Sequence, residues 1–110
     1  MERITAERML RLIGLGLRAR NVVVGVEQVR TAAKKGNLEF AVVAPDASEN
    51  SREKIVPLLR ARRVKFVEGP TAAELGAAVG REHTAAVGVV DPQLARGIRE
   101  LVASSIAGDS

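Results

Sequence analysis

The sequence lacks cysteine, tyrosine and tryptophan, and it contains a single histidine, His83. The absence of cysteine excludes disulfide bonds, thiol catalysis and zinc sites with thiolate ligands, and one histidine argues against a histidine-ligated metal ion. No apolar run approaches the roughly 18 residues of a membrane span, and the charged start does not resemble a signal peptide. Phe40 and Phe66 are the only aromatic residues, which argues against RNA binders that stack bases on aromatic platforms. We therefore expect a cytoplasmic protein with no metal ion, no other cofactor and no membrane partner.

What the sequence does contain is an excess of basic residues. Its 110 residues carry 17 Lys and Arg against 13 Asp and Glu, a formal charge of +4. A chain of this length forms one hydrophobic core, too small to divide into two domains. Basic residues gather in residues 1–36 and again at Arg60, Arg62, Arg63 and Lys65. Such a balance favours a polyanionic partner, although solvated helix faces account for charge runs equally well.

Helix and strand signals alternate along the chain. We expect helices at 5–17, 26–35, 71–80 and 92–103, a further helix that follows the turn and cap segment 45–51 and runs to about residue 62, and strands at 22–24, 39–43, 64–67 and 85–90. Thr5 is the expected cap of the first helix, and Thr71 to Glu74 has the pattern of a capping box. Pro57 removes a hydrogen bond from the third helix, so we expect a kink or a break there. The alternation predicts an α/β protein, a three-layer α/β/α sandwich with a four-stranded mixed sheet, formed by one domain at 1–103 with a frayed tail at 104–110.

No set of residues forms a convincing reaction centre. The segment 14–19 has the letters of a dinucleotide-binding fingerprint, but it lies at the end of a helix with the strand after it, so we expect no cofactor there. Asp46 and Asp91 have the pattern of turn and cap residues. His83 is either a solvent-facing loop residue or a contact for a phosphate or base, and no nucleophile stands near it. The sequence therefore predicts a protein that is not an enzyme.

The segment from Gly25 to Gly36 is the most informative part of the chain. A glycine between a strand and a helix allows another backbone to approach closely, and the helix start then presents free N–H groups. Glu27 and Gln28 add hydrogen-bonding groups, and a carboxylate suits base amino and imino groups better than phosphates. The alternative is that Glu27 simply complements the helix dipole.

Five pieces of sequence, at 13–20, 25–36, 46–51, 56–59 and 74–80, together resemble a known family. From about residue 12 to 101 the chain resembles the ribosomal protein L-seven-Ae and L-thirty-e superfamily, and most of all its small bacterial YlxQ-type branch. The resemblance implies a similar sandwich fold and binding to kink-turns, which are sharply bent RNA internal loops with sheared G·A pairs. An unbroken helix through Pro57 would count against this alignment.

The resemblance also places functional residues. The family's Gly-x-Asn-Glu-x-x-Lys motif falls on Gly25, Val26, Glu27, Gln28 and Thr31, and only the glycine is identical. Arg30 and Lys34 can supply charge near the replaced lysine. The loop before the last strand, apolar in strong kink-turn binders, has the sequence Arg81-Glu82-His83-Thr84 here. These departures leave the fold untouched and allow an RNA other than a kink-turn.

We therefore predict a monomeric, non-enzymatic protein that binds structured RNA, ribosomal RNA foremost, and associates with the ribosome. In this interpretation Gly25 to Thr31 contact base edges, Arg81 to Thr84 close over an unpaired nucleotide, and basic residues hold the RNA backbone. The RNA-binding residues are Arg18, Arg20, Asn21, Gly25, Val26, Glu27, Gln28, Arg30, Thr31, Lys34, Lys35, Arg81, Glu82, His83 and Thr84. A protein–protein adaptor would instead need an exposed apolar patch, and a small-ligand or nucleotide enzyme a pocket with convergent polar groups and a perturbed titratable residue.

Overall fold

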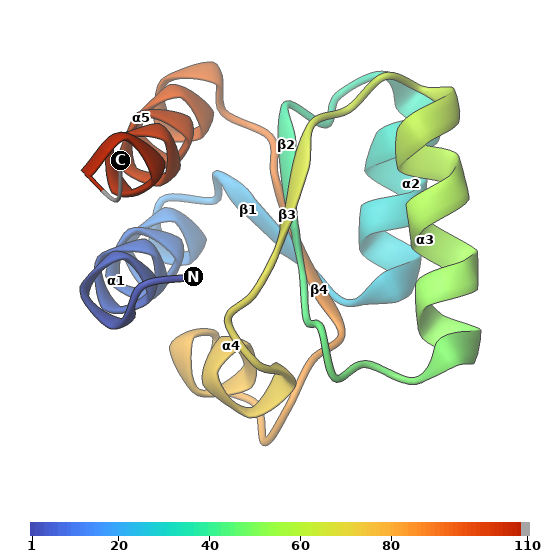
Figure 1. Cartoon of the computed structure of the whole chain (residues 1–110). Coiled ribbons are helices and arrows are strands. Elements are labelled where there is room, and N and C mark those ends of the chain that lie inside the picture. Colours follow the sequence, from blue (N-terminus) through green and yellow to red (C-terminus); the bar gives the residue numbers. More distant parts are fainter. Residues whose placement is uncertain (109–110) are drawn as a thin grey trace.

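Helices and strands alternate along residues 1–108, the part of the chain that the computed structural model describes (Figure 1). In chain order the elements are α1 (Arg3–Arg18), β1 (Val22–Val24), α2 (Val26–Lys35), β2 (Phe40–Val43), α3 (Glu49–Ala61), β3 (Phe66–Glu68), α4 (Ala72–Ala78), β4 (Ala86–Val89) and α5 (Pro92–Gly108). Within these residues, no helix has both the length and the apolar character that crossing a membrane requires.

The four strands form one mixed sheet in the order β1-β4-β2-β3. Strand β4 runs antiparallel to both β1 and β2, whereas β2 and β3 are parallel. Strands β1, β2 and β3 therefore all start at one end of the sheet, where β4 finishes. We call this the strand-start end, formed by segments 18–21, 34–39, 60–65 and 90–92; it is uppermost in Figure 1. The opposite, strand-exit end is formed by segments 25–28, 44–49, 68–74 and 80–85.

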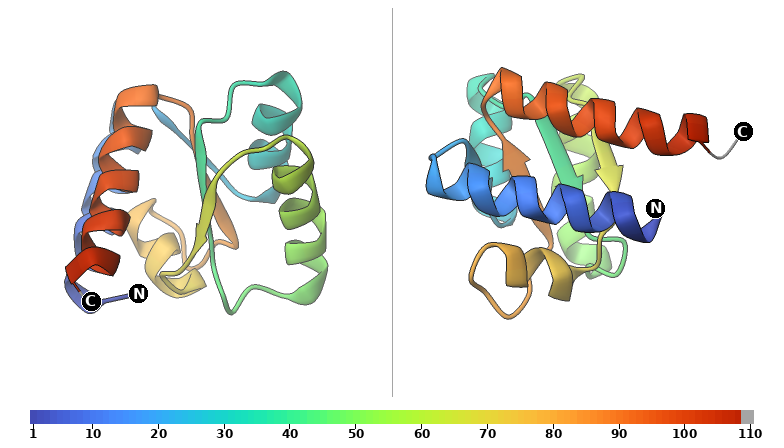
Figure 2. Two further views of the ribbon diagram at one scale, coloured as in Figure 1. Left: turned by 45° about the horizontal axis from the view of Figure 1, so that its top comes forward. Right: turned by 90° about the vertical axis from the view of Figure 1, so that its left-hand side faces the viewer.

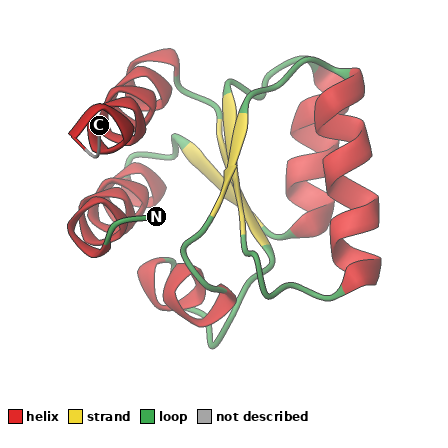
Figure 3. Cartoon of the chain, viewed as in Figure 1, coloured by secondary structure: helices red, strands yellow, loops and turns green. Residues whose placement is uncertain are grey.

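Helices cover both faces of the sheet, which confirms the predicted three-layer sandwich (Figure 3). Helices α1, α4 and α5 lie on one face, with α1 and α5 side by side (Figure 2), and α2 and α3 lie on the other. The first face buries Met9, Ile13 and Ile98 in its core, and the second buries Ile55 and Leu59. Strands β2 and β4 are buried at every position, as expected for central strands made of continuous apolar runs.

Several helix and strand ends differ from the prediction. Helix α1 starts at Arg3, and Thr5 is not its cap; Thr5 is buried inside the helix, where its hydroxyl donates to Glu2 Oε1 at 3.4 Å. Strand β3 starts at Phe66 because the Val64 N–H is used by the end of α3, where it donates to the Leu59 carbonyl.

Helix α5 continues past its predicted end at residue 103 to Gly108. The sequence over 104–107 contains neither glycine nor proline, so nothing in it stops a helix before Gly108. Residues 109–110, the end of the predicted frayed tail, lie outside the described residues.

The break expected at Pro57 is absent, because α3 runs as one helix from Glu49 to Ala61. Pro57 is exposed, and so is Glu53, whose carbonyl loses its usual partner. Water can therefore satisfy that carbonyl without a break in the helix. We expected an unbroken helix to count against the family alignment. The helix is unbroken because Pro57 and the Glu53 carbonyl both face solvent.

Side-chain caps are present at the starts of α3 and α5. The Ser48 hydroxyl accepts from the Ser51 N–H, and Asp91 Oδ2 accepts from the Leu94 N–H at 2.8 Å. Asp46 Oδ1 accepts from the Ala72 N–H at 2.8 Å and so joins the β2–α3 turn to the start of α4. Both aspartates are therefore cap and turn residues, as expected.

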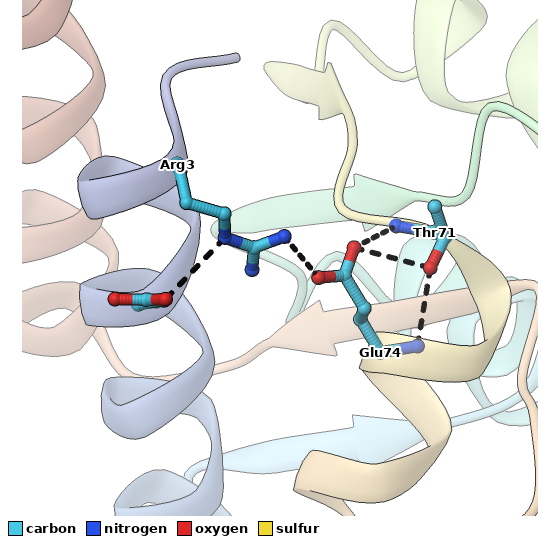
Figure 4. Close-up of polar contacts among 4 residues, drawn as sticks. Arg3, Thr71 and Glu74 are labelled. Atoms are coloured by element: carbon cyan, nitrogen blue, oxygen red, sulfur yellow. Dashed lines mark hydrogen bonds and ion pairs between the residues drawn. The ribbon is translucent and has the colours of Figure 1, made fainter.

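The capping box of α4 also ties this helix to α1 (Figure 4). Glu74 accepts from the Thr71 N–H at 3.1 Å and pairs with Arg3, which also pairs with Glu7. The hydrogen bond from the Thr71 backbone, followed by the contact with Arg3, lowers the pKa of the Glu74 carboxyl. This carboxylate is thus part of the scaffold at the strand-exit end.

Candidate functional site

The strand-exit end brings together the two segments that the sequence singled out. The Gly25 N–H donates to the Ala86 carbonyl at 2.9 Å, so the start of α2 lies beside the segment that leads into β4. Gly25 has φ +92°, a conformation that side-chain-bearing residues rarely adopt. A Cβ placed there would lie 3.8 Å from Arg81 Nη1. The Arg81 guanidinium is therefore a direct neighbour of the α2 start, although 56 positions separate Gly25 from Arg81 in the chain.

Gly76 in α4 seats the loop that carries Arg81. A Cβ at Gly76 would lie 2.5 Å from His83 Cα and 2.6 Å from His83 N, so only glycine lets the loop pack this closely. The loop is held by the Arg81 N–H, which donates to the Gly76 carbonyl at 2.8 Å, and by the Thr84 N–H, which donates to the Ala72 carbonyl at 3.0 Å. The result is a rigidly placed loop beside α2.

Burial divides the four residues of this loop. Arg81, Glu82 and His83 are exposed, whereas Thr84 is only 6% exposed and its hydroxyl donates to the Ala86 carbonyl at 3.3 Å. The Thr84 side chain therefore supports the turn into β4 and presents little surface to a partner, whereas its three neighbours face solvent.

Gln28 has a structural contact that sequence reasoning missed. Its Oε1 accepts from the Val24 N–H at 2.9 Å, and Val24 lies on the edge strand β1. This contact leaves both N–H donors of the amide, and one lone pair of its oxygen, for another partner. In the sequence, only the spacing of four residues between Val24 and Gln28 indicates this contact. The spacing predicts a hydrogen bond only if β1 is an edge strand, because the Val24 N–H is then not used by a neighbouring strand.

A groove runs along α2 beside the open edge of β1. It has a volume of about 790 Å³. Its lining residues are Val23, Glu27, Gln28, Thr31, Ala32, Lys35, Gly36, Asn37, Glu39, Val90 and Pro92. Glu27, Thr31 and Lys35 follow one another at four-residue steps, so they share one face of the helix. The groove thus leads from the strand-exit end to the strand-start end.

Five of the predicted site residues lie away from the contact between Gly25 and Arg81. Arg18, Arg20 and Asn21 lie at the strand-start end, as do Lys34 and Lys35 at the far end of α2. Helix α2 has ten residues, so about 15 Å of helix separates Lys34 and Lys35 from the Gly25 region, whereas strand β1 separates Arg18, Arg20 and Asn21 from it.

Arg30 is also directed elsewhere. Its Nη1 donates to the Lys54 carbonyl on α3, so its guanidinium is held between the two helices. The Arg30 guanidinium is therefore directed toward α3, and it does not line the groove.

Carboxylates outnumber cations at the strand-exit end. Its acidic residues are Glu27, Asp46, Glu49, Glu68, Glu74 and Glu82, and Arg52 and Arg3 are engaged by Glu68 and Glu74 in ion pairs. Arg81 is the basic residue that lies beside Gly25. This region offers hydrogen-bonding groups, whereas phosphate groups would meet more negative than positive charge.

The exposed apolar side chains expected of a protein–protein adaptor, and the perturbed titratable residue expected of an enzyme, lie outside the surface formed by Gly25 and Arg81. Among the described residues, the exposed large apolar side chains are Met1, Ile4 and Leu15, which lie on or just before α1. The residue with a perturbed pKa, Glu74, belongs to the capping box and not to the groove. The described residues hold no group of three or more His, Asp or Glu side chains placed to bind a metal ion.

Comparison with known proteins gives a consistent set of relatives. Residues 7–101 match the family described as ribosomal protein L7Ae/L30e/S12e/Gadd45. A curated relative, "RNA-binding protein YlxQ" of Bacillus subtilis (strain 168), is 29% identical over 91 residues, covering 83% of this chain and 91% of that protein.

Two solved structures share the fold. A protein of unknown function from Bacillus halodurans C superposes with a TM-score of 0.79 at 26% identity, covering 86% of this chain and 96% of that one. The Giardia lamblia 15.5kD RNA binding protein superposes with a TM-score of 0.77 at 19% identity, covering 97% and 92% of the two chains.

Proposed function

Because the chain belongs to the ribosomal protein L7Ae/L30e/S12e/Gadd45 family, we propose that it is a non-enzymatic protein that binds structured RNA. The relative that is 29% identical carries the name of an RNA-binding protein, which supports the same function here. The observation that carries the proposal to a site is the contact between Gly25 at the start of α2 and the exposed loop of Arg81. Two segments far apart in the chain form one surface there.

The chemistry of this surface suits base edges. Gly25 leaves room for an RNA strand beside the helix start. The exposed Glu27 carboxylate accepts hydrogen bonds from guanine amino and imino groups, and the free amide donors of Gln28 complement acceptors on a neighbouring base. Base edges are accessible to such groups where the RNA helix is interrupted, since specific recognition of RNA targets loops and bulges whose bases are unstacked.

We further propose that the RNA is bent, as in a kink-turn, and that ribosomal RNA is the first candidate, read in the cytoplasm by a single copy of the chain. Arg81 lies beside the α2 start, and with the exposed Glu82 and His83 of the same loop it closes over an unpaired nucleotide in this proposal. The excess of carboxylates at the strand-exit end supports base contacts over phosphate contacts in this region.

Glu27→Gln tests the base contact. The variant should bind a kink-turn RNA more weakly, by roughly 5- to 150-fold, which corresponds to about 1–3 kcal/mol for one good base contact. It should bind a straight RNA duplex slightly more tightly, because one negative charge near the phosphates is removed. Fluorescence anisotropy titrations of both RNAs measure the two effects.

Glu53→Gln is the matched control, because Glu53 is an exposed glutamate on α3 that does not line the groove. It should change neither titration noticeably. If the wild-type protein binds the kink-turn no more tightly than the straight duplex, or if Glu27→Gln lowers only the melting temperature, the proposed base contact is wrong.

A further inference from the structure

The positive charge of the protein is concentrated at the strand-start end. Eight exposed basic residues lie in the three segments that lead into β1, β2 and β3, and we call them the cationic end: Arg18, Arg20, Lys34, Lys35, Arg60, Arg62, Arg63 and Lys65. The carboxylates of this end are Glu39 and Asp91, and Asp91 caps α5. The rest of the chain holds nine basic and eleven acidic residues. The net charge of +4 therefore arises at this end.

The cationic residues are also free of ion pairs. The ion pairs found among the described residues join Arg3, Arg52 and Arg96 to glutamates, and none of them involves the cationic end. Neighbouring backbone and ring contacts hold two of its arginines in place. Arg62 Nη1 donates to the Lys34 carbonyl at 3.3 Å, and the Arg60 guanidinium lies 6.0 Å from the centre of the Phe66 ring.

Two of these arginines occupy backbone positions that favour glycine. Helices α1, α2 and α3 each end at this end of the sheet in a left-handed residue, which is Arg20 (φ +63°), Gly36 (φ +76°) and Arg63 (φ +57°), respectively. Arg20 and Arg63 are the described non-glycine residues with positive φ.

The hydrogen bonds at these three helix ends are the same. At α1 the Arg20 N–H donates to the Leu17 carbonyl at 3.1 Å, and the next N–H, of Asn21, donates to the Gly16 carbonyl at 2.8 Å. At α3 the Arg63 and Val64 N–H groups repeat this pattern. This is the Schellman arrangement, in which glycine is the usual left-handed residue because it lacks a Cβ.

Arginine at these two positions is unfavourable for the backbone. A side chain in the left-handed region raises the conformational free energy of the folded state, and Gly36 shows that the same end of the sheet accommodates glycine. Complementing the helix dipole does not require these arginines, since Arg18 and Arg60 already lie in the last turns of α1 and α3. The structure thus places unpaired positive charge at positions where it lowers stability.

We infer that the cationic end is a second RNA surface, which binds the phosphate backbone of a helix that flanks the bent segment contacted by α2. This inference rests on the proposed function. The groove along α2 supports one continuous RNA path, because it leads from Glu27 and Gln28 at one end to Lys35 at the other. An RNA that follows it meets base-contacting groups first and phosphate-binding groups about 12 Å further on.

The double variant Arg20→Gly with Arg63→Gly tests this inference, since glycine relieves the backbone and removes the charge. It should melt at the same temperature as the wild type or higher. Its affinity for a straight RNA duplex and for a kink-turn RNA should fall alike, by about tenfold at low salt. A plot of log affinity against log salt should become shallower by about 1–2, since each lost phosphate contact contributes about 0.7–0.9. The double variant Arg20→Lys with Arg63→Lys, which keeps both charges, should retain most of the wild-type affinity.

The control is the double variant Arg8→Gln with Arg11→Gln, which has the same net charge and alters exposed arginines of α1 outside the cationic end. It should keep the wild-type affinity and salt slope. The inference is wrong if the glycine variant keeps the wild-type slope, or if the control loses affinity equally. Failure of the proposed base contacts looks different: the wild type would bind kink-turn and duplex equally well, while the salt slope would still report on the cationic end.

Discussion

Gln28 has two separable tasks, so substitutions at this position give the sharpest test of the site. Its oxygen accepts from the Val24 N–H at 2.9 Å, and a hydrogen bond of this kind contributes about 1 kcal/mol to folding. Alanine is a slightly better helix former than glutamine, which recovers a few tenths of a kcal/mol. Gln28→Ala should therefore destabilise the protein by about 0.5–1 kcal/mol. For a domain of this size that lowers the melting temperature by roughly 2–5 °C.

Gln28→Glu separates the two tasks. A carboxylate at position 28 still accepts from the Val24 N–H and suits the first turn of α2, so the melting temperature should stay at or above that of the wild type. It lacks N–H donors, so affinity for a kink-turn RNA should fall by about fivefold or more if Gln28 donates to a base.

Thermal melts and anisotropy titrations of both variants decide the matter, with Gln93→Ala as the control because Gln93 is exposed on α5. If Gln28→Ala has the same melting temperature as the wild type and Gln93→Ala, the hydrogen bond to Val24 contributes nothing to stability and the argument is wrong. If Gln28→Glu binds the kink-turn RNA as the wild type does, Gln28 does not contact a base.

Three further predictions follow from packing, ionisation and backbone hydrogen bonding. Gly76→Ala puts a Cβ 2.5 Å from His83 Cα, so it should destabilise the protein by about 1–3 kcal/mol, measured by urea denaturation. It should also weaken kink-turn binding more than duplex binding. Wild-type stability together with wild-type RNA affinity would contradict this prediction. Glu74→Gln should be destabilising at neutral pH, and the difference should vanish as the pH falls below 4.5, because the pKa of Glu74 is lowered in the folded state and its ionised form stabilises the fold. Urea titrations at about pH 7 and pH 3 test this, and an equal difference at both would contradict it. Pro57→Ala should stabilise the protein by about 1–2 kcal/mol, since it restores a hydrogen bond to the exposed Glu53 carbonyl; urea denaturation without a gain would show that the proline is not a defect in α3.

The fold was predictable from local signals. Continuous apolar runs indicate the central strands β2 and β4, and their burial at every position agrees with that interpretation. Cap residues such as Asp91 and Thr71 mark helix starts through hydrogen bonds that span only three residues. These signals depend on neighbours in the chain, so one sequence is enough to read them.

The candidate site depended more on strand order, which local signals do not contain. Whether the Val24 N–H is free to bond with Gln28 depends on β1 lying at the edge of the sheet. The cationic end forms because β1, β2 and β3 all start at one end, and the sequence showed its parts only as two separate basic clusters. Thr84 is buried, unlike its neighbours, because the turn packs on α4 through the bond from the Thr84 N–H to the Ala72 carbonyl. The pattern of apolar residues in the sequence does not predict this contact.

The brevity of the outer strands also affects how the protein behaves at high concentration. Both β1 and β3 are three residues long, so another copy pairing with either edge would gain few backbone hydrogen bonds. At β1 the amide oxygen of Gln28 already occupies the Val24 N–H, and at β3 the terminal Glu68 carries a charge next to Arg52. Short, charged or occupied edges are how soluble sheets resist adding strands from a neighbour. Gln28→Ala therefore frees an edge N–H for pairing with another copy, whereas Gln28→Glu does not, and light scattering during the melts of both variants should show the difference.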